Sequence, residues 1–157
     1  MVPASLRQAH ESGETLSFTG EFRHTLDAKG RLIVPARLRD ELVNDQVVLT
    51  MWPDGCVAMW SGEGWRRLEG KLLEQRRSDR TARSVVRAIA ASAHQDTLDR
   101  QGRVMVPQHL RNYAGVARDV VVTGALDHGE LWSPERWDST RVLEPERLEE
   151  LAQELDF

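Results

Sequence analysis

The sequence contains two copies of one short motif, and this repeat constrains the fold more than any other feature. Residues 25–39 (TLDAKGRLIVPARLR) match residues 97–111 (TLDRQGRVMVPQHLR) at an offset of 72 positions, with nine of fifteen residues identical. The similarity continues downstream, where residues 47–50 resemble residues 120–123. A match of this extent indicates a tandem duplication, so we expect two equivalent modules that fold in the same way.

Each copy predicts two short strands around a tight turn, followed by a short helix. In the first copy, the polarity of the side chains alternates along residues 22–26, which is typical of a half-buried strand. Residues 27–30 (DAKG) place Asp first and Gly fourth, as in a type I turn that ends with a left-handed glycine. Residues 31–34 then return as the second strand of a β-hairpin, and Pro35 begins a helix over residues 36–42.

A second strand pair and two helices complete the predicted module. Residues 47–50 and 56–60 form strands around a turn at 53–55, and Ser61 is placed to cap the next helix. A further helix is predicted to start at Ser78. Their spacing predicts that the following side chains face inward from the two helices: Trp65, Leu68, Leu72, Leu73, Val85, Val86 and Ile89. Together these elements predict a mainly β fold with flanking α-helices.

Four residues of the two turns are interpreted as structural. The carboxylates of Asp27 and Asp99 could act as general acids, but the first side chain of such a turn commonly accepts backbone N–H bonds. Gly30 and Gly102 stand where a positive φ is needed, which other residues resist. We therefore assign both pairs to the architecture of the hairpin turns.

The residues around these glycines predict a contact surface for double-stranded DNA. Arg31 and Arg103 follow the glycines at equivalent positions, and the third turn position is polar in both copies, as Lys29 and Gln101. A single turn with an exposed arginine is ordinary, but two equivalent copies form a paired surface. The arginine fork suits phosphate oxygens and the guanine edge, and a lysine adds a point charge for the phosphate backbone.

The net charge of −4 argues at first against a nucleic-acid partner, but the charge is unevenly distributed. Residues 65–90 contain eight basic and three acidic side chains, whereas residues 127–157 contain ten acidic and three basic ones. The basic run is most simply a solvated helix face, and it also suits pairing with the acidic helices of a neighbour. Leucines recur at helical spacing after Pro145, which predicts an amphipathic helix in the acidic segment.

The residues give little support for catalysis. The five histidines form no cluster with metal-ligand spacing, and the grouping of His94 with Asp96 and Asp99 is weak. No phosphate-binding glycine loop or nucleophile elbow is present. We therefore expect no enzymatic activity, metal, cofactor or small-molecule substrate. No apolar run approaches the ~18 residues needed to span a bilayer, so we expect a cytosolic protein without a membrane partner.

The doubled motif resembles the MraZ family. The resemblance is carried by residues 26–39 (LDAKGRLIVPARLR) and 98–111 (LDRQGRVMVPQHLR), and it extends from about residue 18 to residue 137. Members of this family are bacterial regulators of the division and cell-wall gene cluster, built from two SpoVT–AbrB-type swapped-hairpin modules. The resemblance implies that the tandem repeats intertwine into one pseudo-symmetric, double-psi-type β-barrel with helices outside.

The resemblance also implies a mode of action. Protomers would form a homo-oligomeric ring in the cytoplasm and nucleoid, and their hairpin tips would meet short direct repeats in promoters, chiefly as a repressor and usually at the cluster's own promoter. By position, Lys29, Arg31 and Arg103 match the DNA-contacting residues, and Gln101 matches the polar tip position of the second motif. A ring would gather the basic tips of net-acidic protomers on one face.

On these grounds we divide the chain into five segments. They are an N-terminal extension expected to be flexible (1–17), a first repeat with its helix (18–77), a linking helix (78–92), a second repeat (93–140) and an acidic C-terminal helix or tail (141–157).

Two other functions stay open. A DNA-binding antitoxin, or another global regulator of the AbrB type, uses a similar hairpin fold. Such antitoxins usually carry one copy and a disordered toxin-binding tail, so the duplication disfavours them, whereas the acidic tail is compatible with them. A double-psi barrel enzyme would need a catalytic constellation, which the sequence does not show.

Overall fold

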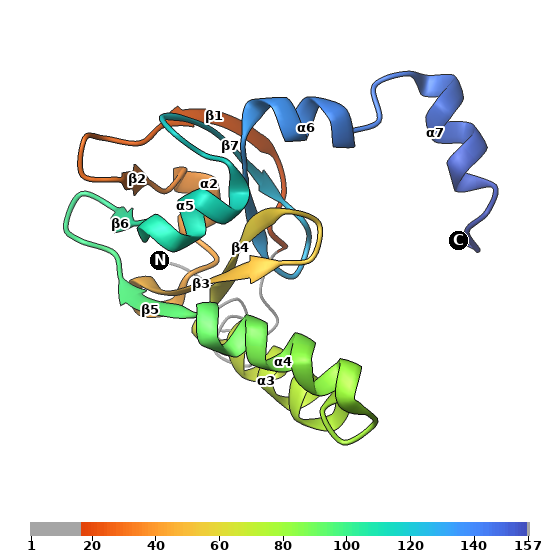
Figure 1. Cartoon of the computed structure of the whole chain (residues 1–157). Helices are drawn as coiled ribbons and strands as arrows, with labels where there is room; N and C mark the ends of the chain where they lie inside the picture. The colour runs from red at the N-terminus through yellow and green to blue at the C-terminus, as the bar shows by residue number, and fades with distance from the viewer. Residues whose placement is uncertain (1–16, 157) are drawn as a thin grey trace, which may run out of the picture.

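The computed structural model describes residues 17–156 (Figure 1). Its strands are β1 (Glu21–Thr25), β2 (Arg31–Ile33), β3 (Gln46–Trp52), β4 (Cys56–Ser61), β5 (His94–Thr97), β6 (Arg103–Met105), β7 (Asp119–Gly124) and β8 (Gly129–Trp132). Its helices are α2 (Ala36–Arg39), the 3-10 turn η1 (Val43–Asp45), α3 (Gly62–Gln75), α4 (Arg80–Ser92), α5 (Gln108–Ala114), α6 (Pro134–Thr140) and α7 (Pro145–Ala152). The predicted N-terminal extension, residues 1–17, lies outside the described residues except for Ser17.

The duplication appears directly in the order of the strands. One antiparallel sheet has the order β1-β7-β8-β4-β3-β5, and a second sheet joins β2 to β6. The repeat makes β1 equivalent to β5, β7 to β3 and β8 to β4, so the six-stranded order is the same from either end. A pseudo-two-fold axis therefore passes between β8 and β4. The fold is mixed α/β, and the strand pairing of residues 17–156 forms two open sheets and not a closed barrel.

The strands on either side of each tip pair with the other repeat. In the first repeat, β1 pairs with β7, where Phe22 faces Val122, and β2 pairs with β6, where Leu32 faces Val104. In the second repeat, β5 pairs with β3. The prediction that residues 31–34 return beside residues 22–26 as a simple hairpin is therefore wrong in its strand partners. Alternation of polarity identifies the buried face of a strand, but it does not identify the neighbour that covers that face.

The main core lies between the modules and draws equivalent residues from both. Leu38 on α2 and its counterpart Leu110 on α5 are both fully buried, with 0% exposure. Leu32 and Val104 meet them from the β2–β6 ribbon in the same apolar cluster. Burial of one such side chain contributes roughly 1.5–3 kcal/mol. Neither module can bury its apolar face alone, so the two fold as one unit.

Serine and aspartate side chains begin the outer helices. The Ser61 and Ser133 hydroxyl oxygens each accept a backbone N–H from the first turn of α3 and α6, at 3.0 and 3.2 Å, as the sequence predicts for Ser61. Helix α4 begins one residue later than predicted, because the Asp79 carboxylate accepts the capping N–H at 2.7 Å. The Ser78 hydroxyl donates instead to the carbonyl of Gln75.

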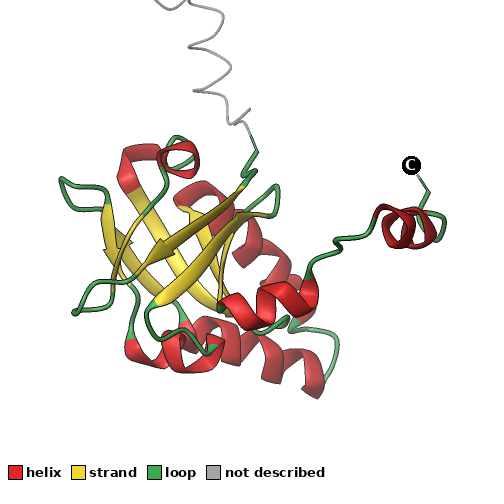
Figure 2. Cartoon of the chain, turned by 90° about the horizontal axis from the view of Figure 1, so that it is seen from above, coloured by secondary structure: helices red, strands yellow, loops and turns green. Residues whose placement is uncertain are grey.

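Helices α3 and α4 form a hairpin that covers the sheet only at one end. Trp65 and Ile89 lie in an apolar cluster with strand residues at the near end. Leu73 and Val85, predicted to face inward, are 45% and 46% exposed, because the far end of the hairpin extends beyond the sheet. Figures 1 and 2 show this extension, with the α3–α4 turn farthest from the strands.

Candidate nucleic-acid interface

The first tip is built around the carboxylate of Asp27. Its Oδ1 accepts the backbone N–H groups of Lys29 and Arg31, both at 2.9 Å, and its Oδ2 accepts Nε of Arg31 at 2.7 Å. The Gly30 N–H donates to the Asp27 carbonyl at 2.9 Å, and Gly30 adopts φ 80°. The hydrogen bond from the Arg31 backbone N–H, assisted by the Arg31 side chain, lowers the pKa of Asp27 to about 2.

The second tip repeats this geometry. Asp99 accepts the backbone N–H groups of Gln101 and Arg103 at 2.9 and 3.0 Å, and it accepts Nε of Arg103 at 2.7 Å. Gly102 adopts φ 76°. Hydrogen bonds from the backbone and side chain of Arg103 lower the pKa of Asp99 below its usual range. In both tips an aspartate therefore fixes the direction of the arginine that follows the glycine.

The two tips are tied to each other through the repeat symmetry. The Val34 N–H donates to the Gly102 carbonyl, and the Val106 N–H donates to the Gly30 carbonyl, both at 2.9 Å. These reciprocal bonds join the glycine of each tip to the residue that follows the second strand of the other tip, β2 or β6. As a result, backbone hydrogen bonds join the two tips directly to each other.

Arg39 and Arg111, which follow strands β2 and β6, each pack against the tip of the opposite module and so support it. A Cβ atom on Gly30 would lie 2.9 Å from the guanidinium carbon of Arg111, and one on Gly102 would lie 2.7 Å from Nη1 of Arg39. Arg39 is held by Asp45 through two hydrogen bonds of 3.1 and 3.0 Å. From the sequence, a solvated position and a contact or salt-bridge role are equally open for Arg39 and Arg111, and the structure shows the contact role. The signal that could have found them is their identical place in both copies.

One exposed cation of the tips, Arg100, was not expected from the sequence. Lys29 and Gln101 are exposed, as is Arg100, which sequence reasoning did not select. The side chains of Arg31 and Arg103 are only 31% and 26% exposed, because each Nε is bound to its aspartate. Each tip thus presents one exposed cation, Lys29 or Arg100, beside a partly exposed arginine that is bound through Nε to its aspartate.

Both tips project from the same side of the molecule. In Figures 1 and 2 the β1–β2 and β5–β6 loops lie together at the left, while the α3–α4 turn and α7 lie at the right. The structure thereby brings Lys29, Arg31, Gln101 and Arg103 to one side. This arrangement places a pair of matched turns, each with an exposed cation, on one side of the molecule.

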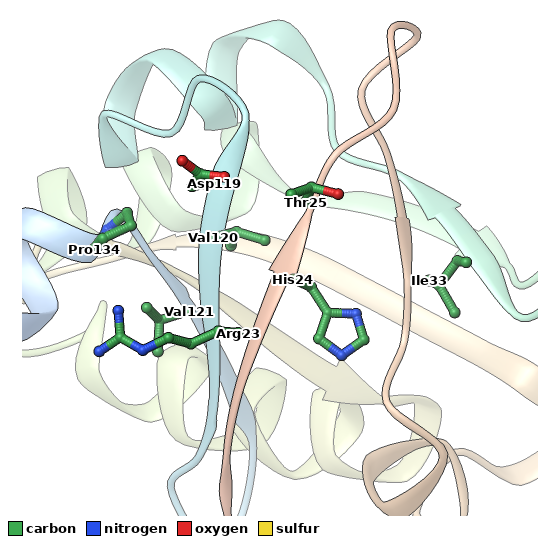
Figure 3. Close-up of a pocket in the computed structure, with 8 residues that line it drawn as sticks. All are labelled: Arg23, His24, Thr25, Ile33, Asp119, Val120, Val121 and Pro134. Carbon is green, nitrogen blue, oxygen red and sulfur yellow. The ribbon is translucent and has the colours of Figure 1, made fainter.

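A recess of about 550 Å³ lies at the base of the first tip, beside β1 (Figure 3). Arg23 and His24 line it from β1, with Ile33 from the far side. A second recess of about 420 Å³ occupies the equivalent place beside β5, where Gln95 and Asp96 stand at the matching positions. The two recesses share a threonine and two valines at equivalent positions, but the polar pairs Arg23–His24 and Gln95–Asp96 differ, so the recesses follow from the repeated fold and do not define a repeated catalytic set.

The weak metal-ligand grouping from the sequence is not assembled. His94 lies 3.4 Å from Asp96, whereas Asp99 is engaged with Arg103 in the second tip. No group of three or more metal-ligating side chains suited to an ion occurs in residues 17–156.

Within residues 17–156, no helix combines the length and apolar character needed to cross a membrane. Cys56 is buried, and burial raises the pKa of its thiol far above the usual range, which disfavours the reactive thiolate form.

The fold and its tips define a duplicated, mixed α/β protein whose two modules exchange strands and present paired Asp-x-x-Gly-Arg turns on one side. The chain belongs to the MraZ family: the family model described as "MraZ protein, putative antitoxin-like" matches residues 17–88 and again residues 89–152.

Three relatives illustrate the extent of the similarity, and each is named Transcriptional regulator MraZ. The protein from Leuconostoc citreum is 38% identical over 141 residues, which cover 89% of this chain and 98% of the relative. The one from Heliobacterium modesticaldum is 41% identical over 141 residues, with the same coverage of 89% and 98%. The one from Clostridium beijerinckii is 45% identical over 120 residues, covering 76% of this chain and 84% of the relative.

Proposed function

We propose that this chain is a sequence-specific DNA-binding transcription regulator, and that Lys29, Arg31, Gln101 and Arg103 contact the DNA. The observation that carries the proposal is the pair of equivalent tips on one side, each with an arginine oriented by an aspartate. A guanidinium held in one direction loses less conformational freedom when it binds a base edge or a phosphate. We add Arg100 to the contact residues, because it is the exposed cation of the second tip.

The proposal extends to the assembly. The protomer carries a net charge of −4, so a single copy attracts DNA weakly. A homo-oligomeric ring that turns several tip pairs to one face concentrates the cations where the phosphates lie. We infer that such a ring binds short direct repeats in the promoter of its own gene, chiefly as a repressor of the division and cell-wall gene cluster. It would act in the cytoplasm and nucleoid, without catalytic activity.

The domain division follows the same reasoning. We infer swapped-hairpin modules over residues 18–77 and 93–140, joined by a linking helix over 78–92 and followed by an acidic tail over 141–157. The exchange of β1 and β5 between the modules supports this division.

A gel shift with the DNA upstream of the protein's own gene tests the function. We expect a discrete shifted complex that survives excess unrelated DNA, and light scattering on the same sample should give a mass of several protomers. Equal affinity for the upstream DNA and for unrelated DNA would refute sequence-specific regulation.

The antitoxin alternative rests on the wording of the family description and on the acidic tail. An antitoxin would hold a toxin through that tail. Copurification of a stoichiometric second protein that is released when residues 141–157 are deleted would support it. The regulator proposed here needs no such protein in order to bind its operator.

A further inference from the structure

A cationic groove lies between α3 and α4, on the part of the hairpin that extends beyond the sheet. It has a volume of about 530 Å³ and is lined by Arg76, Arg77, Arg83, Val86, Arg87 and Ala90. Among residues 17–156, no ion pair joins any of these four arginines to a carboxylate. Four unneutralised guanidinium groups around an apolar floor suit an acidic partner that carries an apolar stripe.

Helix α7 has the complementary properties. Leu148 on α7 and Leu155, three residues beyond its end, are 59% and 64% exposed, and at seven residues apart they form one apolar stripe. Residues 142–156 contain six acidic side chains and one basic one, Arg147, whose ion pair with Glu150 stays within the helix. Figure 1 shows α7 standing apart from the sheet. A helix of eight residues is marginal in water without tertiary packing, so its apolar stripe needs a partner.

We propose that α7 of one protomer docks into the α3–α4 groove of a second copy of this chain. The leucine stripe would cover Val86 and Ala90 on the groove floor, and the carboxylates beside the stripe would meet the arginines of its rim. Glu144 directly precedes α7 and Glu154 follows its last turn, so the two carboxylates lie at the two ends of the leucine stripe. Glu146 and Glu149 lie on the opposite face.

The groove of the same protomer is a poor site for its own tail. Helix α6 packs on β7, whereas α3 starts at the end of β4 in the other half of the sheet. Only residues 141–144 link α6 to α7, and four residues span at most about 14 Å. The groove lies near the far end of α3, whose 14 residues extend about 20 Å from its start. A second copy can supply the groove without this limit, and such head-to-tail contacts can close into rings.

DNA is the less favoured occupant of the groove. The tips project from one side of the molecule, and the α3–α4 turn projects toward the other (Figures 1 and 2). One duplex bound by the tips would therefore not reach the groove of the same protomer.

Charge reversal of each surface tests the contact, which rests on the homo-oligomer proposed above. The groove variant carries Arg83→Glu and Arg87→Glu, and the tail variant carries Glu144→Arg and Glu154→Arg. We expect each full-length variant alone to need about tenfold or more protein to assemble, measured by light scattering across a dilution series. An equimolar mixture of the two should assemble again, because each reversed surface then meets a complementary one on the other chain.

Matched variants separate the contact from net charge and from folding. Arg67→Glu with Lys71→Glu changes exposed cations of α3 outside the groove, and Glu146→Arg with Glu149→Arg changes the opposite face of α7. Both should assemble as the wild type does, and all variants should show unchanged melting of the body.

Each other outcome would overturn the proposal. If a chain that carries all four substitutions assembles like the wild type but the mixture of single-surface variants does not, the tail docks on its own protomer. Loss of DNA binding by the groove variant alone, with assembly intact, would assign the groove to DNA. A wild-type oligomer that neither variant weakens would refute the contact and leave the proposed function standing, whereas a wild-type monomer would refute the proposed ring itself.

Discussion

The guanidinium of Arg39 in the first repeat lies directly against Gly102 at the tip of the second, where a Cβ atom would come within 2.7 Å of Nη1. Arg111 and Gly30 form the same contact in the other direction. Each tip is therefore braced by the opposite module, and the position of one tip depends on the fold of both. The tips of a protomer act as one preorganised pair.

Replacement of Gly30 or Gly102 by Val should damage folding as well as DNA binding. Both glycines have positive φ, and a side chain in such a conformation costs roughly 1–2 kcal/mol before its collision with the bracing arginine is counted. Denaturant unfolding measures the loss. Gly70→Ala, on an open part of α3, is the matched control and should stabilise by about 0.5–1 kcal/mol. Wild-type stability together with lost binding would show that these glycines are contact residues.

Arg31→Ala or Arg103→Ala should abolish most specific binding with little loss of stability. One good base contact contributes roughly 1–3 kcal/mol, repeated over every tip that binds. The ion pair to the aspartate is solvated, so its loss should lower the free energy of unfolding only slightly. Titration against operator DNA gives the affinity, with Arg67→Ala on α3 as the control. A variant that binds like the wild type would refute the role of the tips.

Lys29→Ala or Arg100→Ala should weaken binding to operator and unrelated DNA alike. In the proposed complex these exposed cations contact phosphates, so each substitution should reduce the slope of log affinity against log salt by roughly one for every phosphate that is no longer neutralised. Affinities measured across a salt series test this expectation. An unchanged slope with altered sequence preference would instead mean that these residues bind base edges.

The turns could be predicted from the sequence because their chemistry is local. Asp27 and Gly30 lie three residues apart, and the hydrogen bonds and positive φ that they supply involve no distant part of the chain. The strand partners could not be predicted in this way. Thr25 pairs with Asp119 in the other repeat, and alternation of polarity is satisfied by any partner that covers the apolar face.

Only the candidate site residues at positions that match in both copies could be predicted from the sequence. Comparison of the copies selects positions that match, so it selects Arg31 and Arg103 but passes over Arg100, which has Ala28 as its counterpart. The bracing role of Arg39 depends on its distance from Gly102, and only the exchange of strands brings the two together.

Acid should destabilise the first tip over a defined range. The folded pKa of Asp27 is about 2, below its usual 3.8, because the charged carboxylate is hydrogen-bonded by Arg31. A depressed folded pKa stabilises the native state above the unfolded value, and this stabilisation is lost as the pH falls from about 4 towards 2. NMR titration of the carboxyl carbon should give the low midpoint, and Asp27→Asn should remove this part of the acid sensitivity. A midpoint near 3.8 would contradict the tip geometry.

In the proposed mode of action, the tips of several assembled protomers bind one stretch of DNA together. Its most direct test is the affinity, at one salt concentration, for DNA with a single short repeat, with a correctly spaced pair, and with that pair separated by about 5 further base pairs, which is half a helical turn. We predict that the spaced pair binds much more tightly than the single repeat, because the second contact is intramolecular. The insertion should remove most of this gain, although both repeats remain intact. Equal affinity for the single repeat and for the spaced pair would contradict joint binding of one DNA by several protomers.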